Sequence, residues 1–101
     1  MKKLLVTMAI TVAVTSAMAD GLTLAKSNNC LACHAINQKL VGPAYKDVAS
    51  KYAGRKDAVE YLAKKIKSGG SGVWGVIPMP AMAQLTDAQA KELAEWVLST
   101  K

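Results

Sequence analysis

The sequence predicts a small all-α domain of three to five short helices. Apolar residues recur at helical spacing in several segments, and no segment shows the sustained alternation of apolar and polar residues that is typical of a half-buried strand. Residues 68–80 hold four glycines and two prolines, so we expect a loop without regular structure there. A structureless loop of that length is unusual in so small a domain, which indicates that it wraps around a bound group.

The first 19 residues are typical of a cleaved secretory signal. Lys2 and Lys3 precede an apolar run, and Ala17-Met18-Ala19 places small residues where a signal peptidase cuts. The apolar run is shorter than the roughly 20 residues of a membrane span, so a membrane anchor is the weaker interpretation. We therefore expect a signal peptide over residues 1–19, a periplasmic location, and a single domain over residues 20–101.

The chain is basic, with 13 Lys and Arg residues against seven Asp and Glu residues, and without Lys2 and Lys3 it keeps a formal net charge of +4. The basic residues are spread along the domain and do not alternate with aromatic residues, so nucleic-acid binding is not expected. Two interpretations of the charge remain open. It forms a solvated lysine-rich surface, or it forms a face that docks an acidic protein partner.

Four segments of the domain carry a helical pattern. The first begins near Asp20 and leads into the stretch CLACH at residues 30–34, and a loop with a Gly42-Pro43 turn separates it from the second. Asp57 is expected to cap the third helix, and Thr86 begins a capping box for the fourth. The apolar stripes of the last three helices comprise Tyr45, Val48, Ala49 and Tyr52, then Ala58, Tyr61, Leu62 and Ile66, and finally Ala90, Leu93, Ala94 and Val97.

The stretch CLACH contains both cysteines, Cys30 and Cys33, and the only histidine, His34. A thioredoxin-type redox dithiol would need a βαβ pattern around the motif, and the sequence does not predict one. A structural zinc site would need a fourth ligand, and no further Cys or His exists to supply it. Covalent haem accounts for all three residues, because the two thiols bond to the porphyrin and His34 becomes the proximal ligand of the iron. An attached haem would also enlarge the apolar core of a very small domain.

The second axial position of the iron is either open or closed by another side chain. Three of the five methionines belong to the predicted signal peptide, so Met79 and Met82 are the candidates. Pro78 and Pro80 flank Met79 and restrict its backbone, whereas Met82 lacks such support and is more typical of a packing residue. Met79 is therefore the expected ligand. A His/Met pair raises the reduction potential relative to two nitrogen ligands, which is typical of an electron carrier.

Four strings resemble the small bacterial class I cytochromes c, the cytochrome c-551/c-552 group. They are CLACH, LVGPAYKDVA from residue 40, SGVWGVIPMP from residue 71 and the ending AEWVLSTK, and the similarity covers nearly all of residues 20–101. The resemblance implies a cytochrome c fold wrapped around one covalent haem c. It also implies thioether bonds to Cys30 and Cys33, with His34 and Met79 as axial ligands.

The same resemblance implies supporting roles for two residues. The Pro43 carbonyl would accept a hydrogen bond from the second ring nitrogen of His34, and the Trp74 indole would donate to a haem propionate. Two positions depart from the group, because Lys65 stands where relatives often carry arginine, and Ala81-Met82 follow the second proline of PMP where relatives often have Pro-Asn. The lysine loses a bidentate contact to a propionate. Without the asparagine donor, the orientation of the Met79 side chain and the reduction potential are the least transferable features.

The predicted function is one-electron transport without substrate chemistry. The resemblance implies a monomer that shuttles between a cytochrome bc1-type donor and a nitrite reductase or terminal oxidase as acceptor. The alternative is a weak peroxidase or gas-binding protein in which Met79 dissociates, although no second histidine exists as a distal base. The lysines that could ring the haem edge and steer acidic partners are Lys26, Lys39, Lys46, Lys64 and Lys67.

Overall fold

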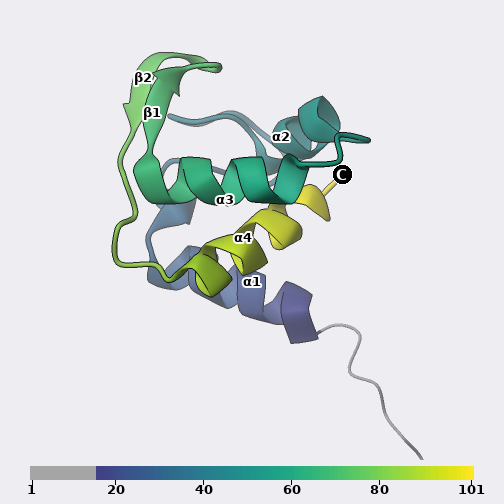
Figure 1. Cartoon of the computed structure of the whole chain (residues 1–101). Helices are drawn as coiled ribbons and strands as arrows, with labels where there is room; N and C mark the ends of the chain where they lie inside the picture. The colour runs from purple at the N-terminus through teal and green to yellow at the C-terminus, as the bar shows by residue number, and fades with distance from the viewer. Residues whose placement is uncertain (1–15) are drawn as a thin grey trace, which may run out of the picture.

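The structure, a computed structural model, describes residues 16–101 as four α-helices, a short 3-10 helix and one β-hairpin (Figure 1). This confirms the expected class of a few short helices. Residues 1–15 of the predicted signal peptide lie outside the described residues, and within those described no helix is long and apolar enough to cross a membrane. The elements are α1 (Ser16–Ser27), η1 (Cys30–Ala32), α2 (Tyr45–Tyr52), α3 (Ala58–Ser68), β1 (Gly70–Gly72), β2 (Gly75–Met79) and α4 (Asp87–Leu98).

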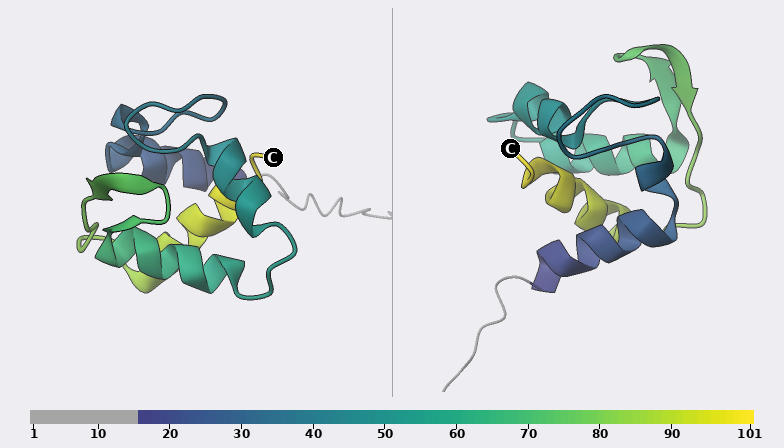
Figure 2. Two further views of the ribbon diagram at one scale, coloured as in Figure 1. Left: turned by 90° about the horizontal axis from the view of Figure 1, so that it is seen from above. Right: turned by 180° about the vertical axis from the view of Figure 1, so that it is seen from behind.

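Helix α4 is the centre of the helical core and packs against α1, α2 and α3. At its contact with α1, Gly21 lies so close that an added Cβ would be 2.5 Å from Cγ of Trp96, so the two helices can approach only with glycine at this position. Figure 2 shows α1 and α4 side by side beneath α3. All four predicted stripe residues of α4 are buried, together with Trp96. The stripe of α2 is buried in full, whereas that of α3 buries Ala58 and Leu62 and leaves Tyr61 and Ile66 half-buried.

One predicted helix cap is confirmed and the other is wrong. The Thr86 hydroxyl accepts a hydrogen bond from the Gln89 backbone, and the Gln89 side chain accepts one from the Thr86 backbone, which forms the expected capping box. Asp57 precedes α3, but its carboxylate makes no capping hydrogen bond. It pairs with Arg55 instead, and this hydrogen bond lowers the pKa of the Asp57 carboxyl. The Asp57 carboxylate therefore bonds to a charged guanidinium two residues away and not to the backbone amides at the start of α3.

The prediction that residues 68–80 hold no regular structure is wrong. Strands β1 and β2 pair antiparallel, with Gly70 opposite Met79 and Gly72 opposite Gly75 and an irregularity between the two pairs. The three glycines have positive φ angles, which explains how a glycine-rich segment forms a tight, twisted hairpin. All of β1 and most of β2 are exposed, so the alternation of buried and exposed residues that predicts a strand is absent. The hairpin stands at the end of α3 (Figure 1).

Candidate functional site

The chemistry-bearing residues of the sequence meet at one cavity of about 840 Å³. Residues of α2, α3, the hairpin and the loop before α2 line it. Its volume lies within the range of roughly 300–1,000 Å³ that is usual for small-molecule and cofactor sites. The lining includes the residues for which the sequence predicted a role as ligand or in its direct support, namely Cys30, Cys33, His34, Pro43, Lys65, Trp74, Met79 and the competing Met82. Of the five lysines expected near its edge, Lys39 lines it.

The CLACH motif turns tightly as it leaves α1. Asn29 has a left-handed backbone (φ 59°), and the turn that follows is closed by a hydrogen bond of 2.9 Å from the His34 amide to the Cys30 carbonyl. This turn brings Cys30, Cys33 and His34 to the cavity wall. The two cysteines do not form a disulfide with each other, so both sulfurs can bond to a bound group, and burial raises the pKa of the Cys30 thiol.

His34 is held by contacts on several sides. Its Nδ1 lies 2.7 Å from the Pro43 carbonyl oxygen, which confirms the predicted hydrogen bond. A carbonyl can only accept, so Nδ1 is the donor and Nε2 is the ring nitrogen left to bind a metal. Tyr45 stacks on the imidazole with ring centroids 5.0 Å apart, and burial raises the pKa of its phenol. Gly42 lies against the ring, where an added Cβ would be 2.5 Å from Cε1 of His34.

Met79 ends β2, half-buried, at the base of the hairpin. The backbone of its segment runs directly against Gly69, whose φ is 66° and whose added Cβ would overlap the Met79 carbonyl oxygen and lie 2.8 Å from the Ala81 nitrogen. Farther along, the Met82 amide donates to the Ile66 carbonyl at 3.1 Å. The methionine segment therefore lies against the end of α3 at Gly69 and is hydrogen-bonded to α3 at Ile66.

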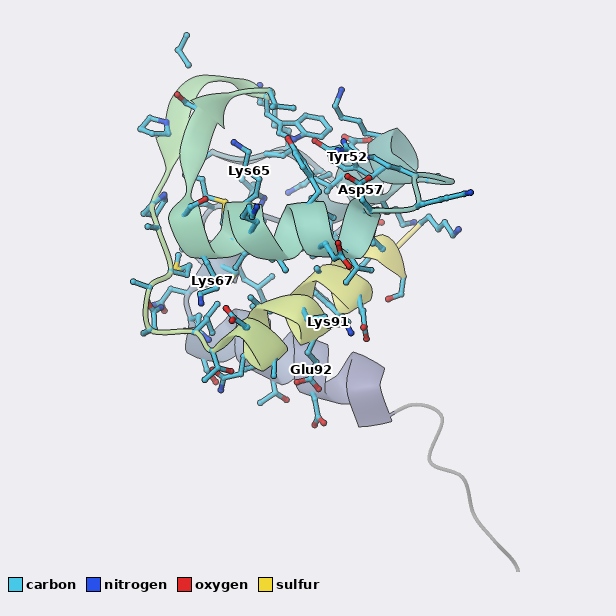
Figure 3. The ribbon with its side chains drawn as sticks, in the orientation of Figure 1. Tyr52, Asp57, Lys65, Lys67, Lys91 and Glu92 are labelled. Atoms are coloured by element: carbon cyan, nitrogen blue, oxygen red, sulfur yellow. The ribbon has the colours of Figure 1, made fainter. Side chains whose placement is uncertain are left out.

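The two residues expected near the propionates also lie at the cavity. Trp74 is 42% exposed, and the Lys51 ammonium lies 5.6 Å from its ring centroid, a cation–π contact between the hairpin turn and α2. Lys65 rises from the upper side of α3 beneath the hairpin (Figure 3). Lys67 lies on the lower side of α3 and pairs with Asp87. A cationic group is thus available to an anionic substituent in this cavity, although it is an ammonium and not a bidentate guanidinium.

The arrangement disfavours the two other interpretations of CLACH. Across residues 16–101 no group of three or more His, Cys, Asp or Glu side chains is gathered as a metal ion would require, so the motif does not form a zinc site by itself. The sheet in the described part of the chain is an exposed antiparallel hairpin, not the βαβ scaffold of a thioredoxin-type dithiol. Two thiols and an imidazole along one wall of a large cavity fit a bulky group bonded to all three.

Comparison with known proteins decides the family. The family described as Cytochrome c matches residues 18–101. The chain belongs to the cytochrome c family. It is 67% identical to cytochrome c-552 of Hydrogenobacter thermophilus over 78 residues, which cover 77% of this chain and 79% of that protein. Cytochrome c-551 of Pseudomonas aeruginosa is 56% identical over 82 residues, which cover 81% and 78% of the two chains.

Solved structures agree with the family assignment. The crystal structure of Nitrosomonas europaea cytochrome c552 aligns with a TM-score of 0.76 at 59% identity, covering 79% of this chain and 99% of that one. A class 1 cytochrome of Sideroxydans lithotrophicus aligns with a TM-score of 0.72 at 30% identity, covering 81% and 94% of the two chains. The chain is therefore a small class I cytochrome c, a monohaem electron carrier that binds haem c covalently through cysteine thioethers.

The cavity fits that cofactor. It has the size for a large flat ring, it presents both thiols of the chain on one wall, and the histidine that follows them has its second nitrogen committed to Pro43. Three contributors to the site were not assigned a role there from the sequence: Gly42, Gly69 and the ring of Tyr45. Gly42 and Gly69 were visible as turn and helix-end residues and Tyr45 as a core residue, but no spacing signal connects them to His34 or Met79.

Proposed function

We propose that the protein is a periplasmic one-electron carrier whose haem iron has His34 and Met79 as axial ligands. Cys30 and Cys33 would form the two thioether bonds. The observation that carries this proposal is that His34, with its Nδ1 committed to Pro43, and Met79, anchored by the end of α3, both line the cavity that contains the thiols. When bound, the haem supplies the iron that takes up and releases one electron.

The hydrogen-bond pattern favours Met79 over Met82 as the sulfur ligand. The Met82 sulfur accepts a hydrogen bond from the Gln84 amide at 3.4 Å. Within residues 16–101 the Met79 sulfur accepts none, so its lone pairs are available. Pro78 and Pro80 restrict the backbone at Met79. Less backbone entropy is therefore lost when this segment is held in one position.

The protein's own residues would keep the site nearly unchanged between the two oxidation states. The Pro43 carbonyl fixes the tautomer and ring orientation of His34 and raises its basicity, and Tyr45 prevents the ring from tilting. Gly69 allows the Met79 backbone to lie against α3. Because neither ligand needs to move when charge changes, the reorganisation that accompanies electron transfer is small. A closed coordination of this kind also supports the proposal that the protein is not an enzyme.

Redox partners would dock over the mouth of this cavity. Exposed apolar residues there include Val41, Val73, Trp74 and Ile77, and Lys39 lines the same cavity. An apolar patch with nearby ammonium groups suits a redox protein with an acidic rim. The donor would be of the cytochrome bc1 type, and the acceptor a nitrite reductase or terminal oxidase. Electron-transfer rates should fall as ionic strength rises, and rates independent of salt would rule out electrostatic steering.

A spectroscopic comparison tests the ligand assignment. The oxidised protein should show a sulfur-to-iron charge-transfer band that is retained in Met82→Ala and lost in Met79→Ala. The reduced wild type should not bind carbon monoxide readily, because both axial positions are filled. Ready binding of carbon monoxide by the native protein would instead support a peroxidase or gas-binding role in which Met79 dissociates. Haem that remains on the polypeptide after acid-acetone extraction would identify the thioether bonds.

A further inference from the structure

The segment after Met79 is tied to the other side of the molecule by the side chain of Gln84. Its Nε2 donates to Oδ1 of Asn28 at 3.0 Å and to Sδ of Met82 at 3.4 Å. Asn28 is itself anchored, because its Nδ2 donates to the Leu24 carbonyl in α1 at 2.9 Å. One amide thus connects the end of α1, just before CLACH, with a methionine sulfur more than 50 residues away.

Met82 is held at its backbone as well as at its sulfur. Its amide donates to the Ile66 carbonyl, and its own carbonyl accepts from the Leu85 amide, both at 3.1 Å. The side chain is half-buried against the helical core, yet it also lines the cavity that contains His34 and Met79. Met79 and Met82 therefore line the same cavity, and the proposed His34 ligation leaves one axial position for a sulfur. One of these sulfurs is engaged by a donor and the other is not.

We propose that Gln84 is a positioning residue that keeps the Met82 sulfur from competing with Met79 for the haem iron. This inference rests on the proposed His34 and Met79 ligation. A thioether is a weak acceptor and keeps a second lone pair, so the hydrogen bond acts by position: it holds the Met82 side chain toward α1, on the side of Asn28. The Asn28 anchor makes the restraint directional, because the Gln84 amide cannot follow the sulfur without losing its own partner.

The measurement is the proton NMR spectrum of the reduced holoprotein. A methionine methyl bound to low-spin iron lies over the porphyrin face, and the ring current shifts its resonance far upfield. Wild type should show one such methyl, which persists in Met82→Leu. Gln84→Ala should show a second upfield methyl, with the share of the second form raised about three- to fivefold, the effect of one neutral hydrogen bond. The second resonance should vanish in the double variant Gln84→Ala, Met82→Leu.

Two further variants separate positioning from a general loss of structure. Gln84→Glu keeps the length of the side chain but cannot donate, so it should reproduce the second methyl at unchanged helix content. Gln38→Ala removes an exposed glutamine with no hydrogen bond in the described residues and should give the wild-type spectrum. If both Gln84 variants show a single upfield methyl at the wild-type position, the inference is overturned and the Met79 assignment stays intact. A wild-type methyl that is lost in Met82→Leu would overturn the Met79 assignment itself.

Discussion

Replacing Gly42 by alanine should displace His34 and destabilise the domain. The new methyl group would lie 2.5 Å from Cε1, 2.9 Å from Nδ1 and 3.0 Å from Nε2 of His34. Ordinary contacts between carbon atoms are about 3.5–4.0 Å, so the ring would have to move by about 1 Å. Tyr45 stacks on the ring and resists this movement, and Pro43 accepts its hydrogen bond at 2.7 Å. A shift of about 1 Å away from Pro43 would lengthen that bond past the limit of a hydrogen bond.

The magnitude follows from two contributions. Loss of the His34–Pro43 hydrogen bond costs about 0.5–1.5 kcal/mol of the free energy of unfolding. Overpacking of a fitted site costs about 1–3 kcal/mol more. The sum, about 1.5–4.5 kcal/mol, corresponds in a domain of this size to a fall in Tm of roughly 6–36 °C. Gly42 has no positive φ angle, so the effect comes from the contact with His34 and not from backbone strain.

Thermal unfolding of the oxidised holoprotein, followed by circular dichroism, measures the loss. Solvent exchange of the His34 Nδ1 proton, followed by NMR, should become faster in Gly42→Ala. Leu40→Ala is the matched control, because this exposed residue of the same loop does not line the cavity and should change the free energy of unfolding by less than about 0.5 kcal/mol. The reasoning fails if Gly42→Ala unfolds at the wild-type temperature with the Nδ1 proton still protected, because the loop would then yield without cost.

Three further predictions concern the distal segment, the last helix and alkaline pH. Gly54→Ala places alanine at φ 79° in open space and should cost about 1–2 kcal/mol, whereas Gly69→Ala should cost more and weaken the sulfur-to-iron band by displacing Met79. If the two variants lose the same free energy of unfolding and Gly69→Ala keeps an unchanged sulfur-to-iron band, Gly69 does not position Met79. Thr86→Ala removes the hydroxyl acceptor of the capping box and should lower the free energy of unfolding in urea by about 1 kcal/mol. Burial raises the pKa of Tyr52 to about 12, so stability is full below the ordinary tyrosine pKa near 10 and falls as pH rises toward 12. Tyr52→Phe should flatten this fall in denaturation curves between pH 10 and 12, and parallel curves would assign the fall to another group.

Features that depend on near neighbours in the chain were predictable. CLACH places two thiols and an imidazole within five residues, which indicates haem attachment. The apolar residues of α4 recur at helical spacing and the two residues of its capping box are three positions apart, so both features are readable without tertiary information. The hydrogen bond of His34 to Pro43 was predicted only from resemblance to a family, because no local rule connects residues nine positions apart across a loop.

Features that depend on contacts across the fold were not predictable. The hairpin was not predictable because its exposed strands lack a buried face. The expected cap at Asp57 fails for a local reason, because Arg55, two residues before it, pairs with its carboxylate. Gly69 could be recognised as the end of α3, but not as the residue that allows the Met79 backbone to pass. The hairpin and the contact at Gly69 depend on the position of one segment relative to another.

The sequence by itself determined the chemistry of this protein: its two thiols, its single histidine, two candidate methionines in the domain, and the helices that would surround a bound group. These follow from residue identity and short-range periodicity, which no rearrangement of the chain changes. The tertiary structure decided which methionine sulfur is engaged by Gln84 and which is free, and how closely Gly42 and Gly69 bring the backbone to the two proposed ligands. These features depend on how closely parts of the chain approach one another, to within a few tenths of an ångström. That closeness is set only when the helices pack.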